Sequence, residues 1–213
     1  GANGRPSIGL GLTLDWLDLN GLLPPLPDGP ALTAGLAGFD LNLRLAADRI
    51  AWAGLAADRA TLDGALENGR LTLRRLALRT GEADLAASGA VQLGASPRLQ
   101  DVTLELNGAG ATLVPWLPAG WSGLAPLLAQ PVALRLTGSG AAEALALRAE
   151  GDLGALRVEA GALLDTVQDR GTASLTLRHP GAARLLAPLL GEEVRDWLGQ
   201  GSFSAIANLS GQG

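Results

Sequence analysis

The sequence predicts a mainly β fold: an elongated, curved antiparallel meander that forms a groove. Leucine alternates with other residues over many short segments, and turn-forming residues separate these segments at short intervals. Successive side chains of a strand point to opposite faces, so each such segment has one apolar and one polar face. Glycines interrupt nearly every stretch, and each one would cost a helix about 1 kcal/mol relative to alanine.

The clearest alternation covers residues 40–45, where every second residue is leucine and the residues between are polar. Leucine and alanine favour helices over strands, but a helix would spread these leucines around its circumference. Period two therefore predicts a strand. The same alternation predicts strands at residues 70–74, 101–106, 132–136, 145–148, 157–159, 174–178 and 202–210.

Turn signals lie between these segments. Asn68-Gly69 is the best hairpin signal, because both residues tolerate the positive φ of a tight primed turn. Further turns are predicted at residues 80–82, 95–97 and 138–140. Residues 85–91 and 158–163 each read as strand, glycine, strand, which is a weak internal repeat typical of a sheet assembled from similar units.

Three segments depart from the alternation. Residues 20–31 contain four prolines and are predicted to be a loop or linker. Residues 111–130 are rich in proline and tryptophan, which favours short helices or an irregular bridge. Residues 181–199 have helical spacing, and Pro188 and Gly191 are expected to divide them into two short helices.

The chain is interpreted as one repeat-built segment, residues 1–213, of a longer protein. Its sub-units are expected at about residues 38–110 and 131–213, bridged by the Pro/Trp-rich stretch. The sequence begins without methionine and contains no run of about 18 apolar residues that would form a membrane-spanning helix. Any signal or membrane anchor is therefore expected outside it.

Composition argues against nucleic-acid binding and against catalysis. The net charge is −5 and the arginines are dispersed, whereas phosphate binding needs a basic patch. The chain has no cysteine and one histidine, His179, which lacks the partners of a catalytic triad or metal site. We interpret His179 as part of a strand-to-helix turn, and we predict no enzyme activity, cofactor or metal.

Two groups of carboxylates are candidates for paired acids or cation ligands. Asp15 and Asp18 are better explained by backbone hydrogen bonds at a strand end or turn. Glu192 and Glu193, with Asp196 after them, suit the start of a helix, where the dipole favours negative charge. The five tryptophans are interpreted mainly as core or groove-edge packing: Trp16, Trp52, Trp116, Trp121 and Trp197.

The helices expected at residues 111–130 and 181–199 are scant cover for the apolar face of at least ten strands. Such a sheet can bend into a trough that leaves its concave face to fatty-acyl chains. The predicted groove residues are leucines of the alternating segments: Leu41, Leu43, Leu45, Leu71, Leu73, Leu104, Leu106, Leu134, Leu136, Leu175 and Leu177.

Residues 39–55, followed by residues 68–73 and 85–89, resemble a recurring element of the AsmA family of bacterial envelope proteins. Residues 175–180 and 199–203 are similar to another segment of that family. The resemblance implies a periplasmic segment of a protein held in the inner membrane through a part outside this chain. It also implies phospholipid transport along a β-groove, a link to outer-membrane assembly, and no catalytic residues.

Two functions therefore remain open from the sequence. The first is a lipid-binding groove segment whose partners are phospholipid or fatty-acyl chains. The alternative is a structural or adhesive module, a β-solenoid or sandwich, whose apolar faces are packed by protein. In either case free strand edges are expected to allow oligomers.

Overall fold

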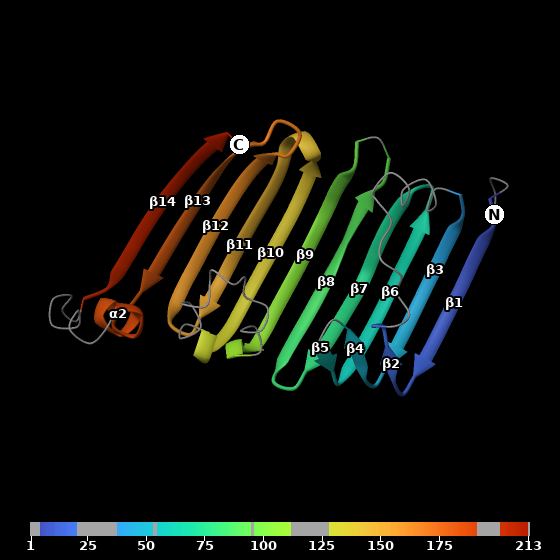
Figure 1. The fold of residues 1–213 in the computed structure, drawn as a ribbon, viewed down its shortest axis with the longest axis horizontal. Helices are drawn as coiled ribbons and strands as arrows, with labels where there is room; N and C mark the ends of the chain where they lie inside the picture. Colours follow the sequence, from blue (N-terminus) through green and yellow to red (C-terminus); the bar gives the residue numbers. More distant parts are fainter. Residues whose placement is uncertain are drawn as a thin grey trace. The chain divides into compact units, whose positions relative to one another are not determined.

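The computed structural model describes residues 5–20, 38–52, 55–94, 96–111, 128–190 and 201–212. Figure 1 shows that these residues are almost entirely β-strand. The elements are β1 (Ser7–Leu14), β2 (Leu17–Asp18), β3 (Asp40–Ala47), β4 (Ile50–Trp52), β5 (Leu55–Ala57), β6 (Arg59–Glu67), β7 (Arg70–Thr80), β8 (Ala83–Gln92), β9 (Arg98–Ala109), β10 (Pro131–Ala141), the 3-10 helix η3 (Ala142–Ala144), β11 (Leu145–Leu153), β12 (Leu156–Asp165), β13 (Arg170–His179), α2 (Ala182–Leu190) and β14 (Phe203–Gln212).

Eleven of the strands form one sheet in the order β1-β3-β6-β7-β8-β9-β10-β11-β12-β13-β14. From β6 onwards each strand follows its neighbour along the chain, so the predicted mainly β meander is confirmed. The sheet is open, with β1 and β14 as its edge strands. One pair departs from the antiparallel prediction, because β1 and β3 are parallel. A parallel pair needs a long crossover connection, and residues 15–39 separate these two strands.

A smaller sheet of order β2-β4-β5 packs against the first strands of the large sheet. Its Ile50 and Ala57 form a buried cluster with Ala47 of β3 and Ala60 of β6. Leu14, Leu17, Leu19 and Leu78 pack around this cluster. The small sheet therefore covers one end of the apolar side of these strands.

The hairpin predicted at Asn68-Gly69 is confirmed. Both residues have positive φ, 52° and 71°, as a primed two-residue turn between β6 and β7 requires. The turn predicted at residues 138–140 is wrong, because these residues lie within β10. Residues 85–91 and 158–163 likewise each lie within one strand, β8 and β12. Glycine permits extended conformations that other residues avoid, so glycine here continues a strand rather than ending it.

The first helix expected in residues 181–199 is present as α2, and its proline does not end it. Pro188 lies inside α2, which ends at Leu190, the residue before Gly191. The second helix of that segment lies outside the described residues, as do residues 21–31 of the proline loop and residues 112–127 of the Pro/Trp-rich stretch. Within the described ranges, no helix has the length and hydropathy that a membrane crossing requires.

Contacts within the chain divide it into two units. Unit 1 comprises Gly1–Leu104 with Gly138–Ala142, and unit 2 comprises Glu105–Thr137 with Glu143–Gly213. The prediction that the whole chain is one groove segment of a longer protein stays a prediction.

Candidate functional site

The first candidate surface is one face of β1, β3, β6, β7 and β8 in unit 1. Residues directly opposite one another on paired strands share a face, so the registers align side chains into rows. Four such rows cross these strands, and each contains only apolar residues or glycine. We call this surface the unit 1 face, which consists of Ile8, Leu10, Leu12, Leu14, Leu41, Leu43, Leu45, Ala47, Ala60, Leu62, Gly64, Leu66, Leu71, Leu73, Leu76, Leu78, Leu85, Ala87, Gly89 and Val91.

A β-bulge in β7 keeps this face continuous. Leu73 and Leu76 are three residues apart, so in a regular strand they would point to opposite faces. The register shifts at Arg74 and Arg75, where two residues of β7 lie opposite one residue of β8. The bulge therefore places four leucines of β7 on the unit 1 face: Leu71 and Leu73 before it, and Leu76 and Leu78 after it.

The second candidate surface is one face of β11, β12, β13 and β14 in unit 2. The registers again align rows, and the only side chain in them that is neither apolar nor glycine is His179, at one end. We call this surface the unit 2 face, which consists of Leu145, Leu147, Ala149, Gly151, Leu153, Leu156, Val158, Ala160, Ala162, Leu164, Gly171, Ala173, Leu175, Leu177, His179, Phe203, Ala205, Ala207, Leu209 and Gly211.

The opposite side of unit 1 carries charge. Asp63 of β6 accepts a hydrogen bond from the Arg74 Nη1 at 2.7 Å and forms an ion pair with Arg44 at 3.6 Å. Arg79 is 2.7 Å from Asp84. That contact holds the pKa of the Asp84 carboxyl below its usual range, chiefly through the hydrogen bond from Arg79.

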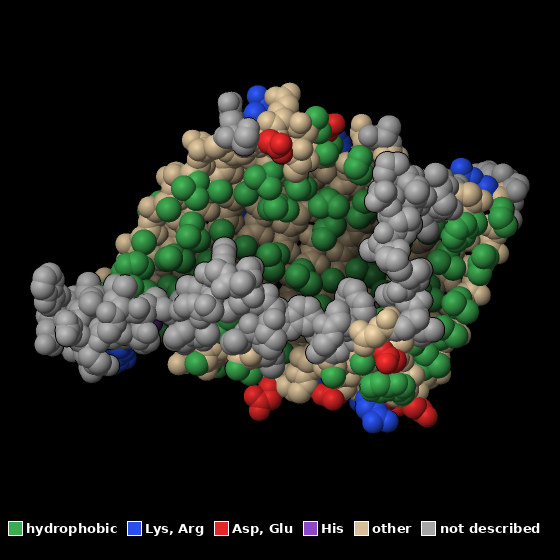
Figure 2. Space-filling view, in the orientation of Figure 1, with side chains coloured by type: hydrophobic (Ala, Val, Ile, Leu, Met, Phe, Trp, Pro, Cys, Tyr) green, Lys and Arg blue, Asp and Glu red, His purple; other side chains and the backbone are tan. Residues whose placement is uncertain are grey.

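The opposite side of unit 2 is charged in the same way. Glu159 of β12 lies 3.3 Å from Arg157 and 3.7 Å from Arg178. Exposed ion pairs contribute about 0–1 kcal/mol each, so their placement matters more here than their strength. On the side that faces the viewer in Figure 2, hydrophobic side chains lie over the strands, and the acidic and basic side chains in view lie near strand ends.

None of the eleven leucines predicted to line a groove is buried. Nine are partly buried, and Leu71 and Leu136 are exposed by 44% and 42%. Several other leucines of the two faces are also open to solvent, including Leu10 at 44% and Leu209 at 69%. Contiguous exposed apolar side chains usually mark a surface that binds something apolar.

The structure places seven of the predicted residues on the two faces. Leu41, Leu43, Leu45, Leu71 and Leu73 share the unit 1 face, and β13 contributes two to the unit 2 face, Leu175 and Leu177. The other four form two pairs spaced two residues apart, so each pair shares one face of its strand, β9 for Leu104 and Leu106 and β10 for Leu134 and Leu136.

The sequence reasoning missed β1. Its Ile8, Leu10, Leu12 and Leu14 alternate with small residues and form one side of the unit 1 face. The period-two signal was present in the sequence. Glycines at positions 9 and 11 hid it, because glycine is a poor strand residue.

His179, Asp18 and Trp16, which the sequence also singled out, lie at strand ends or between strands. His179 ends β13 just before α2, and its Nδ1 lies 2.7 Å from the Gly181 carbonyl oxygen and 3.0 Å from the Gly181 nitrogen, as expected for a strand-to-helix turn. The Asp18 carboxylate accepts a hydrogen bond from the Asn20 N–H. Trp16 is 51% exposed, with the Arg49 guanidinium 5.7 Å from its ring.

Glu192, Glu193 and Asp196 lie outside the described residues, as do Trp116, Trp121 and Trp197. Among the residues that the structure does describe, no group of three His, Cys, Asp or Glu side chains could hold a metal ion.

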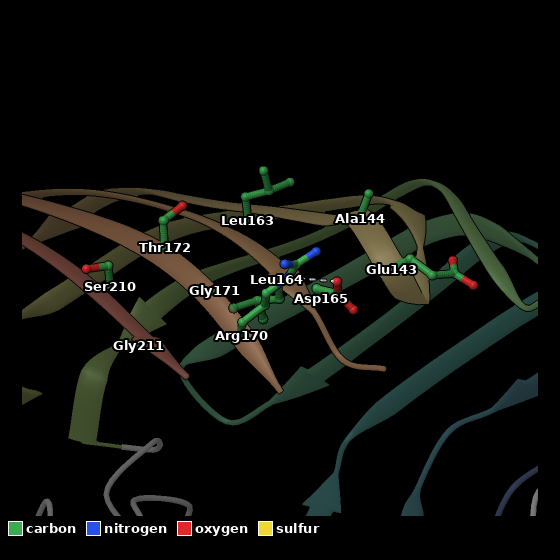
Figure 3. Close-up of a pocket in the computed structure, with 10 residues that line it drawn as sticks. All are labelled: Glu143, Ala144, Leu163, Leu164, Asp165, Arg170, Gly171, Thr172, Ser210 and Gly211. Atoms are coloured by element: carbon green, nitrogen blue, oxygen red, sulfur yellow. Dashed lines mark hydrogen bonds and ion pairs between the residues drawn. The ribbon is translucent and has the colours of Figure 1, made fainter. Parts of the chain in front are cut away.

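An open hollow of about 660 Å³ lies in unit 2 where β12, β13 and β14 approach η3. In Figure 3, Leu163 and Thr172 point to one side of the sheet and Leu164 to the other. The Asp165–Arg170 ion pair lies at the border, with 3.1 Å between Oδ2 and Nε. A neighbouring hollow of about 410 Å³ is lined by the middle parts of the same three strands. The first hollow is bordered by Glu143, Asp165 and Arg170, whereas no titratable side chain lines the second.

Asp165 organises the turn between β12 and β13. Partial burial acts to raise the pKa of this carboxyl, but hydrogen bonds from the Gln168 and Val167 N–H groups and from Arg170 outweigh it, and the pKa is lowered. A lowered folded-state pKa gives stability that is present above the unfolded value of about 3.9 and is lost as pH falls further. We expect the Val167 and Gln168 amides to lose protection from hydrogen exchange below about pH 4.

A suitable control for this prediction is the Gly154 N–H in the turn between β11 and β12, because it donates a hydrogen bond to the Pro131 carbonyl oxygen at 2.7 Å. A carbonyl oxygen does not titrate in this range. Equal loss of protection in both turns would contradict a specific role for Asp165.

Comparisons with known proteins add no relative to this description. No protein-family model, curated protein or solved structure matches the chain.

Proposed function

We propose that this chain binds the acyl chains of phospholipids or fatty acids on its apolar faces, as a periplasmic lipid-transport segment of an AsmA-like protein. The observation that supports this is that apolar and charged side chains lie on opposite sides of each unit. Each has a face made almost entirely of apolar residues and glycine, which is partly open to solvent although Leu66 and Leu156 on it are buried, and each carries its ion pairs on the other side. The link to outer-membrane assembly and to an inner-membrane anchor outside this chain comes from the resemblance stated above.

The energetics of the faces suit transport better than storage. Each buried CH₂ contributes about 0.8 kcal/mol, so an acyl chain of about sixteen carbons gives on the order of 12 kcal/mol gross. Ordering the lipid and removing it from a membrane offset most of this gain. Neither face places a charged residue among its leucines, so an acyl chain meets no fixed polar anchor and can move along the strands.

The groove itself is part of the proposal. A flat apolar face covers one side of an acyl chain, whereas a sheet that bends around the chain removes more of it from water. We propose that each face lines a trough of this kind in the working protein, and that Leu104, Leu106, Leu134 and Leu136 contribute to such a wall.

A fluorescent fatty acid tests the proposal directly. Leu71→Asp together with Leu147→Asp places a charge on the unit 1 face and on the unit 2 face. Both leucines are exposed, by 44% and 38%, so folding should tolerate the change. A charge against an acyl chain must be desolvated, and we expect the affinity for the probe to fall by about tenfold or more.

The matched control moves each substitution by one residue. Thr72→Asp together with Ala146→Asp introduces the same charges on the same strands, but on the opposite side of each unit. This variant should bind the probe as the unmodified chain does. Equal loss in both variants, or no uptake by the unmodified chain and no phospholipid retained in native mass spectrometry, would overturn the proposal.

The alternative of a structural module has one supporting observation, the small sheet that already covers Leu14, Ala47, Ala60 and Leu78 of the unit 1 face. If protein packed the remaining leucines as well, the unmodified chain would take up no fatty-acid probe, and neither variant would differ from it.

A further inference from the structure

The two edge strands of the large sheet share a property that no strand between them has. Each interior strand of that sheet, from β3 to β13, contains at least one Asp, Glu or Arg. The edge strands β1 and β14 contain none, and no lysine either. Within the described part of the chain, each edge strand has one neighbour, so its outer backbone groups face away from the sheet.

This distribution is the reverse of the usual one. Proteins protect free strand edges with charged side chains, prolines, bulges or short strands, because an open edge offers unpaired N–H and C=O groups to another strand. Here β1 has eight residues and β14 has ten, without a proline within either. Two edges built in this way favour pairing with a further strand.

The side chains of the two edges also complement each other in size. On the apolar side β1 carries Ile8, Leu10, Leu12 and Leu14, while the middle of β14 carries only Ala205 and Ala207. On the other side the sizes are reversed: Ile206 of β14 is 71% exposed. Two residues of β1 on that side are glycines, Gly9 and Gly11, and a Cβ on either would meet no atom within 4 Å.

One antiparallel register places large side chains opposite small ones in the centre of both strands. If Ala207 lies opposite Leu10, then Ile206 lies opposite Gly11 and Ala205 opposite Leu12. The register then pairs all eight residues of β1 with residues 203–210, including Ile8 with Leu209, Leu14 with Phe203, and two polar pairs at Ser7 and Thr13. Large side chains lie opposite small ones on both sides in the centre, which is the arrangement that stabilises cross-strand pairs.

We propose that the β14 edge of one copy pairs with the β1 edge of a second copy, antiparallel, with Ala207 opposite Leu10. Pairing of β14 with itself is less favourable, because in a symmetric pair centred on Ile206 it places Ala205 against Ala207 and leaves a gap on the apolar side. The pairing joins the unit 2 face of one copy to the unit 1 face of the next. One strand pair buries little surface, so the association is expected to be weak and to depend on concentration.

Cysteine cross-linking tests the register, because the chain has no cysteine of its own. Leu10→Cys chain is mixed with Ala207→Cys chain under mild oxidation, and the disulfide-linked dimer is measured on a non-reducing gel. The control mixes Leu10→Cys with Ile206→Cys, whose side chain points to the opposite side of the sheet. A disulfide needs Cβ atoms about 3.5–4.5 Å apart, so the control should yield about tenfold less dimer.

Light scattering tests the association without cysteines. Ala207→Asp places a charge opposite Leu10 and should weaken self-association by about tenfold or more, since a desolvated charge costs over about 1.4 kcal/mol. Ala146→Asp adds the same charge at an exposed position of the interior strand β11 and should leave association unchanged. Circular dichroism confirms that each variant is folded.

Three outcomes would overturn the pairing. The chain could stay monomeric at high concentration, the two cysteine mixtures could cross-link equally, or Ala207→Cys alone could give more dimer than its mixture with Leu10→Cys. The last result would show pairing of β14 with itself. None of these measurements uses lipid, so their failure is distinct from a failure of the proposed lipid binding.

Discussion

Gly151→Ala is expected to cost about 3 kcal/mol or more of unfolding free energy, a large part of the roughly 5–15 kcal/mol of a whole domain. Gly151 in β11 has φ of 154°, which side chains rarely adopt, and a Cβ there would overlap the Ala133 carbonyl oxygen and lie 2.8 Å from the Leu134 Cα. The backbone strain contributes about 1–2 kcal/mol and the overlap about 1–3 kcal/mol. Thermal unfolding followed by circular dichroism should show a Tm lower by about 6–12 °C.

The control is Gly161→Ala on the neighbouring strand β12. Its φ is an ordinary one for strands, and a Cβ there would lie 3.4 Å from the Ser174 Oγ, which is normal contact. We expect a change within about 0.5 kcal/mol, because alanine also restricts the unfolded chain. Equal destabilisation by the two substitutions would show that the close approach of β10 to Gly151 does not limit stability.

The strands were predictable because alternation is a local signal. Leu41, Leu43 and Leu45 need no knowledge of their partners to be assigned to one face of a strand. Asn68-Gly69 was predictable for the same reason, since two adjacent residues that tolerate positive φ are enough to form the turn. The parallel pairing of β1 with β3 was not, because it depends on residues far apart in the sequence.

Glycine explains most of what the sequence could not show. In Gly138-Ser139-Gly140 the residues have the composition of a turn, yet β10 continues through them with Gly140 at φ of 117°. Whether a glycine marks a turn, a bulge or a close approach depends on the neighbouring strand, which a single sequence does not contain. The same residue type concealed β1 through Gly9 and Gly11.

The candidate site was predictable strand by strand but not as a surface. Leucines in different strands share a face only when the registers bring them into the same rows, and one residue of slip would place a strand's leucines among the charges. The row that contains Leu10, Leu43 and Leu73 is visible only in the structure. Its continuity depends on the bulge at Arg74 and Arg75.

Deleting Arg75 should therefore be tolerated, whereas deleting Ala77 should cost about 2 kcal/mol or more of unfolding free energy. Without Arg75 the strand alternates regularly, so all four leucines of β7 keep one face and the bulge is no longer needed. Arg74 also keeps its 2.7 Å contact with Asp63. Removal of Ala77 makes Leu76 and Leu78 adjacent, so in any register one of them leaves the unit 1 face.

The two deletions are well matched, because each removes one residue from the same strand. Leu78 packs against the buried cluster of Ala47, Ile50, Ala57 and Ala60, so its displacement also loosens the small sheet. Urea unfolding should give a clearly lower midpoint for the Ala77 deletion and a change within about 1 kcal/mol for the Arg75 deletion. If the Arg75 deletion is the more damaging, the bulge itself, rather than the phase of the leucines, stabilises this part of the sheet.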